Sequence, residues 1–140
     1  QGLREMMINK ARPFLFSTPH PPSVTASCIA AVDLLEQDQS LIEKLWYNTR
    51  YFKAGMKSIG LPTDSESPIV PVIAGESEKA VQLMHTLNEA GIYARAIVFP
   101  TVARDKARVR LMINAQHTQS QLDYVIETFE RVGKQLGIIQ

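Results

Sequence analysis

The sequence predicts an α+β domain in which two helices are followed by a β-α-β-β-α order, with the helices packed on one face of a small, mainly antiparallel sheet. Two observations support this prediction. Apolar residues recur at the helical period in residues 22–35 and 40–59, and short β-branched runs of strand length occupy residues 67–73, 92–99 and 107–113. Capping signals separate these runs from the helices between them.

The first part of the chain is predicted to be a short helix over residues 3–10, then an extended, turn-like segment over residues 11–22, which contain four prolines. Pro22 or Ser23 opens a helix that runs to about residue 35. One stripe of this helix is apolar and includes Cys28, which we therefore expect to be a buried small hydrophobic residue.

Turn and cap residues organise the second half of the chain. The prolines of residues 67–73 indicate an edge strand or the start of a strand. Ser77 has the position of a helix N-cap, and Gly91 is suited to ending that helix in a left-handed conformation. Thr118 and Gln121 have the spacing of a capping box, so a last helix is expected to begin there.

Composition and charge exclude several classes of function. The 15 basic and 14 acidic residues of this 140-residue chain leave a net charge of +1 and are scattered, which argues against a nucleic-acid partner. No apolar run approaches the ~20 residues of a membrane span, and the first residues show no signal peptide. A single cysteine and no histidine set with metal-ligand spacing lead us to expect no metal site and a cytoplasmic location.

The run of residues 107–113 contains the strongest functional signal. Arg108 and Arg110 are two positions apart, so in a strand their guanidinium groups share one face while Val109 and Leu111 pack on the other. A sheet rarely carries two arginines on one face without an anionic partner, and the arginine fork suits a carboxylate or a phosphate. The residues alone leave Arg110 equally open to a surface ion pair, and they favour a structural role for Arg108.

Several motifs, in order along the whole chain, resemble the C-terminal part of the α-oxoamine synthases. They are Ala11-Arg-Pro-Phe-Leu-Phe-Ser-Thr, Ser67-Pro-Ile-Val-Pro-Val, Gly91-Ile-Tyr-Ala, Phe99-Pro-Thr-Val, Ala107-Arg-Val-Arg and Ala115-Gln-His-Thr. This pyridoxal-phosphate-dependent family includes glycine C-acetyltransferase (2-amino-3-oxobutyrate CoA ligase), 8-amino-7-oxononanoate synthase and serine palmitoyltransferase. Residues 45–48 and 132–139 most resemble the glycine C-acetyltransferase branch, with the other two as alternatives.

The resemblance implies the small C-terminal domain of a fold-type-I pyridoxal phosphate enzyme that is normally a homodimer. Residues 1–22 would lead in from a missing large cofactor-binding domain, and residues 23–140 would form the small domain. Such an enzyme condenses an amino acid, here glycine, with an acyl-CoA and releases CoA and, in decarboxylating members, carbon dioxide. The cofactor supplies an electron sink, and the protein orients it and the substrate.

By the same resemblance, Arg110 would bind the amino-acid carboxylate, and Pro100 and Thr101 would line the substrate entrance. Ser17, with Thr18 close by, would hydrogen-bond the cofactor phosphate of the neighbouring subunit. None of the seven lysines has the sequence context of the family's Schiff-base lysine. We therefore expect no catalytic residue in this chain, no covalently bound cofactor and no activity of the isolated fragment.

Two other classes of protein stay open at this point. A free-standing regulatory module could use Arg108 and Arg110 to hold an anionic effector. An oligomerisation domain would need no ligand at all.

Overall fold

The computed structural model describes residues 2–15, 18 and 20–139. The chain divides into two compact units, Gln1–Gln39 and Ser40–Gln140. This division falls later than residue 22, after which the small domain was predicted to begin. The boundary between parts of a longer protein stays a prediction.

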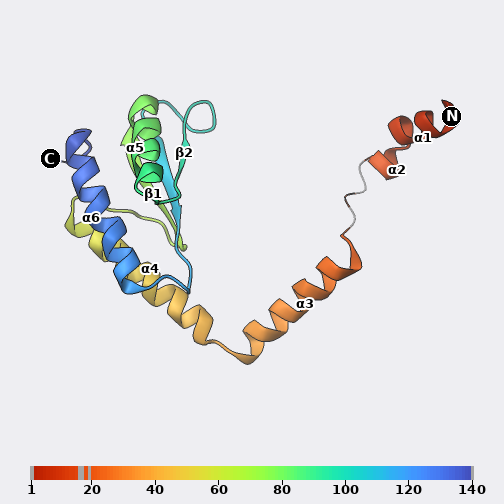
Figure 1. The fold of residues 1–140 in the computed structure, drawn as a ribbon, viewed down its shortest axis with the longest axis horizontal. Coiled ribbons are helices and arrows are strands. Elements are labelled where there is room, and N and C mark those ends of the chain that lie inside the picture. Colours follow the sequence, from red (N-terminus) through yellow and green to blue (C-terminus); the bar gives the residue numbers. More distant parts are fainter. Residues whose placement is uncertain (1, 16–17, 19, 140) are drawn as a thin grey trace. The chain divides into compact units, whose positions relative to one another are not determined.

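The first unit is helical over most of its described residues, which form α1 (Gly2–Lys10), α2 (Arg12–Leu15) and α3 (Pro22–Gln37) (Figure 1). Helix α2 corrects the prediction that residues 11–22 are extended throughout. Pro13 lies in the first turn of α2, where a backbone N–H has no helical acceptor in any case. A proline at that position is therefore compatible with a helix.

Helix α3 begins at Pro22, as predicted, but buries none of its side chains. Cys28 is exposed, so the expectation that it is a buried hydrophobic residue is wrong. Val24 and Val32 on the same stripe are exposed too. An apolar stripe indicates a face that can be buried, but burial needs a surface to pack against, and the described residues of this unit supply none.

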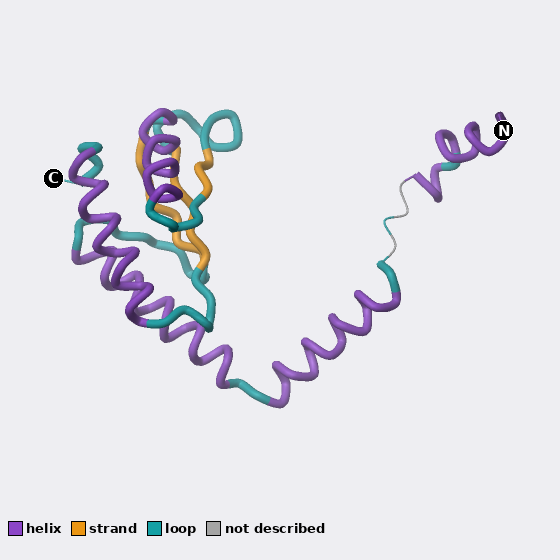
Figure 2. Tube along the Cα trace, in the orientation of Figure 1, coloured by secondary structure: helices purple, strands orange, loops and turns teal. Residues whose placement is uncertain are grey.

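The second unit carries the sheet. Its elements are α4 (Ser40–Ser58), β1 (Ile69–Gly75), α5 (Ser77–Glu89), β2 (Arg95–Ile97), β3 (Ala107–Met112) and α6 (Gln119–Gln135). Figure 2 shows the three strands beside the helices. The strand order is β1-β3-β2, and β3 pairs antiparallel with both neighbours. The predicted β-α-β-β-α order is confirmed, and Pro71 lies in an edge strand, where a missing N–H donor is tolerated.

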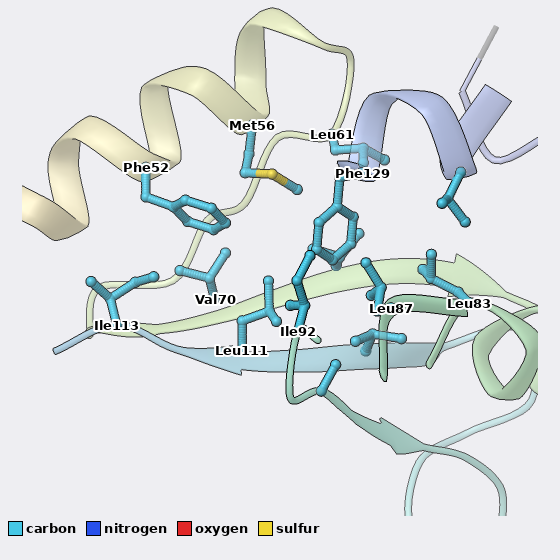
Figure 3. Close-up of a cluster of buried hydrophobic side chains, with 14 of the residues drawn as sticks. Phe52, Met56, Leu61, Val70, Leu83, Leu87, Ile92, Leu111, Ile113 and Phe129 are labelled. Carbon is cyan, nitrogen blue, oxygen red and sulfur yellow. The ribbon is translucent and has the colours of Figure 1, made fainter. Parts of the chain in front are cut away.

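All helices that contribute to the main core cover one face of the sheet. Val70 of β1 is fully buried on that face, beneath Phe52 of α4 and Phe129 of α6, which are also fully buried (Figure 3). Val109 of β3 belongs to the same cluster and is fully buried too. Leu83 and Leu87 of α5 complete the cluster. The predicted arrangement of helices on one face of an antiparallel sheet is therefore confirmed.

Strand β2 is shorter than the predicted run over residues 92–99, and the end of α5 explains why. Gly91 ends the helix with a φ of 77°, and the N–H of Ile92 donates back to the carbonyl oxygen of Leu87 at 2.9 Å. The N–H of Ala94 donates to Oδ1 of Asn88 at 3.1 Å. Since these groups are bonded to α5, pairing with β3 begins only at Arg95.

Candidate functional site

Strand β3 separates the core from an uncovered face of the sheet. Ala107, Val109 and Leu111 are buried, whereas Arg110 is exposed and Arg108 is half-buried on the other face. This alternation confirms the predicted placement of both arginines on one side. The side chain of Arg110 thus starts from a rigid central strand whose opposite face is fixed by the core.

Neighbouring strands place one proline and one arginine beside Arg110. In the register of the sheet, Pro71 of β1 and Arg95 of β2 are its Cα partners. Arg95 is exposed and belongs to the same face. The next row of that face contains Ile73, Arg108 and Ile97. Sequence reasoning did not identify Arg95, although the alternation of residues 92–99 gave the signal that could have found it.

A cleft of about 790 Å³ lies beside residues 91–94, which precede the first residue of β2 that pairs with β3. Its walls come from residues 91–95, from residues 110–114 and from the first turns of α6. Arg110 lines this cleft, and its role in binding a ligand stays a prediction. The main polar side chains in the lining belong to Arg95, Arg110, Asn114, His117, Ser120 and Gln121.

A tight turn at residues 114–117 fixes one wall of the cleft. The Asn48 side chain, only 1% exposed, donates to the carbonyl oxygens of Asn114 at 3.0 Å and His117 at 2.9 Å. Oδ1 of Asn114 accepts from the N–H groups of Gln116 and His117. Nδ1 of His117 accepts from the Asn114 N–H at 3.3 Å, so this histidine helps to orient the turn.

The cleft carries positive charge that no described side chain neutralises. None of the described residues that line it is an aspartate or a glutamate. Ion pairs join Lys79 to Glu76 and Lys134 to Glu130, and none of these four residues lines the cleft. The surface ion pair considered for Arg110 is therefore not formed by the described residues. Arg108 behaves differently, because its Nε donates to the carbonyl oxygen of Lys106 at 3.1 Å.

The other predicted site residues lie elsewhere. Pro100 and Thr101 belong to the turn that follows β2, which is the opposite end of that strand from the cleft, and neither lines it. The N–H of Thr101 donates to the carbonyl oxygen of Val98 at 2.9 Å. Thr18 is exposed, with a φ of 39°, and Ser17 lies outside the described residues.

The cleft does not fit the covalent anchoring of a cofactor by this chain. A Schiff base needs a lysine in an enclosed site, and none of the described lining residues is a lysine. Lys53, for example, donates instead to the carbonyl oxygens of Ser65 and Ser67. Among the described residues, no group of three or more histidine, cysteine, aspartate or glutamate side chains could hold a metal ion. No helix within the described part of the chain is long and apolar enough to cross a membrane.

Comparisons with known proteins agree with this architecture. The family model described as aminotransferase class I and II matches residues 2–129. The 8-amino-7-oxononanoate synthase of Symbiobacterium thermophilum is 49% identical over 140 residues, which are 99% of this chain and 36% of that protein. The 8-amino-7-oxononanoate synthase/2-amino-3-ketobutyrate coenzyme A ligase of Thermus thermophilus is 48% identical over 99% of this chain and 35% of its own length.

A solved structure shows the same fold. The serine palmitoyltransferase from S. paucimobilis, with a bound PLP–myriocin aldimine, superposes with a TM-score of 0.81 and 29% identity. The match covers 96% of this chain and 35% of that one. The chain thus spans about 35% of the length of these relatives. From the extent of the family match, the chain belongs to the aminotransferase class I and II family, whose members depend on pyridoxal phosphate, and its relatives are α-oxoamine synthases.

Proposed function

We propose that this chain is the C-terminal part of a pyridoxal-phosphate-dependent acyltransferase that condenses an amino acid with an acyl-CoA, and that Arg110 binds the carboxylate of the amino acid. One observation carries the proposal. Arg110 lines an acid-free cleft without an ion-pair partner among the described residues, in a chain that belongs to a family of such enzymes. A substrate carboxylate would supply the missing negative charge.

The geometry of the cleft supports a binding and orienting role. A guanidinium group can donate two parallel hydrogen bonds to a carboxylate, which fixes the direction of the bound acid as well as its position. The core behind β3 holds the Arg110 backbone, and the Asn48-anchored turn holds the polar wall beside it. The chemistry of the cofactor is assigned to residues outside the cleft, because the described lining offers no lysine.

Two candidate activities of this reaction type differ in their amino acid and acyl-CoA substrates. Residues 45–48 and 132–139 favour glycine C-acetyltransferase, with glycine as the amino acid. The names of the relatives favour 8-amino-7-oxononanoate synthase, and the Thermus thermophilus relative bears both activities in its name. The activity proposed first is therefore that of 8-amino-7-oxononanoate synthase, with the glycine C-acetyltransferase reaction as the second candidate.

Other predicted roles belong to the same proposal. Ser17 and Thr18 would contact the cofactor phosphate across a homodimer interface, and Pro100 and Thr101 would border the substrate entrance. Family membership favours this enzyme over a free-standing regulatory module or an oligomerisation domain, since the matching family model describes enzymes.

The test uses the full-length protein that contains this chain, loaded with pyridoxal phosphate. Glycine, alanine and serine are each assayed with a short and a long acyl-CoA, in the wild type, Arg110→Ala and Arg110→Lys. We expect Arg110→Ala to lower kcat/KM for the amino acid about tenfold to a hundredfold, because a charge-assisted hydrogen bond is worth about 1.5–3 kcal/mol. The acyl-CoA that reacts distinguishes the two candidate activities.

Arg110→Lys keeps the charge but loses the planar fork, so we expect an intermediate loss. Arg108→Ala is the matched control, since Arg108 is on the same strand and face but is bonded to Lys106. Equal kinetics in wild type and Arg110→Ala, or no condensation with any of these substrates, would remove the proposal.

A further inference from the structure

The strongest feature that the proposed function leaves unexplained is the second arginine of the cleft. Arg95 and Arg110 are Cα partners across β2 and β3, and both line the cleft. Side chains at directly opposed positions of an antiparallel pair lie on the same face, with Cβ atoms about 4.5–5.5 Å apart. The two guanidinium groups can therefore reach a common point above the sheet.

Placing two like charges opposite each other destabilises a sheet unless something compensates them. The residues around this pair supply no compensation. Pro71 is the partner of Arg110 on the other side, Met112 lies two residues after Arg110 in β3, and Tyr93 lies two residues before Arg95. None of the three carries a negative charge. Neither Arg95 nor Arg110 has a hydrogen-bond or ion-pair partner for its side chain among residues 2–15, 18 and 20–139.

Two arginines close to this pair in the sequence, in contrast, have a partner within the chain. Arg108 donates to the carbonyl oxygen of Lys106, and the guanidinium of Arg104 lies over the ring of Phe99 at 5.1 Å from its centroid. Arg95, on the edge strand β2, and Arg110, on the central strand β3, are therefore an uncompensated pair in the lining of the cleft. The compensating group therefore comes from outside the described residues, and a bound anion would supply it.

We propose that Arg95 is a second anion-binding residue of this site and that it shares one oxyanion with Arg110. This inference rests on the proposed function, since the shared oxyanion is the acid group of the substrate. A carboxylate has two oxygens and about four acceptor positions, so it can accept hydrogen bonds from both guanidinium groups at once. Arg95 then determines specificity, because an amide or ester in place of the acid would leave the two positive charges opposed.

The first experiment measures protection of individual arginines in the full-length protein. Phenylglyoxal modification of Arg95, Arg108 and Arg110 is followed by mass spectrometry, with added glycine, alanine or serine in one arm and inorganic phosphate in the other. We expect the amino acid that protects Arg110 to protect Arg95 over the same range of concentration. Arg108 should react at the same rate throughout.

The two arms separate this inference from the proposed function. Protection of both arginines by phosphate but by none of the amino acids would keep the shared site and remove the carboxylate role of Arg110. Protection of Arg110 alone would overturn the shared site and leave the proposed function intact. Absence of protection by every anion would overturn both.

The second experiment reads substrate binding in variants of the loaded enzyme. Arg95→Gln should raise KM for the amino acid about tenfold with kcat almost unchanged, and Arg95→Lys should recover part of the loss. A merely structural role would lower the amount of folded protein without this change in KM. Arg108→Gln, on the adjacent row, should leave KM unchanged, and an unchanged KM in Arg95→Gln would contradict the inference.

Discussion

The side-chain amide of Asn48 donates a hydrogen bond of 2.9 Å to the backbone carbonyl oxygen of His117, 69 residues later in the chain. The same amide reaches the carbonyl oxygens of Asn114 and Ala115. A buried residue of α4 therefore holds the turn that leads from β3 into α6. Since this turn contributes Asn114 and His117 to the cleft, the shape of the candidate site depends on a contact made from the first helix of its unit.

Replacing Asn48 with alanine should destabilise the second unit. We expect the free energy of unfolding to fall by about 1–3 kcal/mol, because the substitution removes a donor that is only 1% exposed and breaks its hydrogen bonds to the carbonyl oxygens of the turn. Urea unfolding measures the loss, and the dependence of the free energy of unfolding on urea concentration should stay unchanged. Asn9→Ala is the control, because Asn9 is exposed on α1 and bonds only within its helix. Equal losses in the two variants would contradict the anchoring role.

Helix α6 should depend on its capping box. The Thr118 hydroxyl accepts from the N–H of Gln121 at 3.3 Å, and the Gln121 side chain accepts from the N–H of Thr118 at 3.0 Å. We expect Thr118→Ala to lower the free energy of unfolding by about 1 kcal/mol and Thr118→Ser to restore most of it. A loss in Thr118→Ser as large as that in the alanine variant would show that the methyl group, and not the hydroxyl, is responsible.

Replacing Gly91 should destabilise the protein because of its backbone conformation and not because of a steric clash. Its φ is 77°, and a Cβ atom added there would meet no other atom within 4 Å. Gly91→Ala is expected to cost about 1–2 kcal/mol through left-handed strain, and Gly91→Asn less, because asparagine tolerates this conformation better. Gly2→Ala also adds a Cβ in open space but without a positive φ, so its free energy of unfolding should hardly change.

The pair Tyr51 and Asp123 predicts how stability depends on pH. The Tyr51 hydroxyl donates to Asp123 at 2.6 Å, and this hydrogen bond is the main cause that raises the pKa of Tyr51 above its usual 10.0. The folded protein thus holds the proton more tightly than the unfolded chain. The resulting stabilisation is complete below the unfolded-state pKa and disappears as the pH rises through the folded-state pKa.

Urea unfolding at a series of pH values tests this prediction. We expect the free energy of unfolding to decrease above about pH 10, where Tyr51 loses its proton more readily in the unfolded chain. Tyr51→Phe should remove the part of the decrease that is due to this hydroxyl. Tyr93→Phe is the matched control, because the Tyr93 side chain is 80% exposed and its hydroxyl makes no hydrogen bond with the described residues. A decrease of the same size in wild type and Tyr51→Phe would assign it to other groups.

Local sequence signals predicted an element well where all the residues that stabilise it are close together in the sequence. Thr118 and Gln121 form the capping box because both partners lie within one turn. Val109 and Leu111 alternate with Arg108 and Arg110, so the faces of β3 could be assigned without knowing its neighbours. The signal failed at Cys28, since an apolar stripe does not say whether a partner surface exists.

The sequence by itself determined the β-α-β-β-α order, the antiparallel sheet under its helices and the place of Arg110 on the face opposite the core, because periodicity and strand alternation are properties of contiguous residues. Only the tertiary structure decided that Arg95 is the neighbour of Arg110 and that Asn48 holds the turn beside them. Those relationships depend on strand register and on the contacts of Asn48 with the turn. Both are set by hydrogen bonds between residues distant in sequence, which no local pattern records.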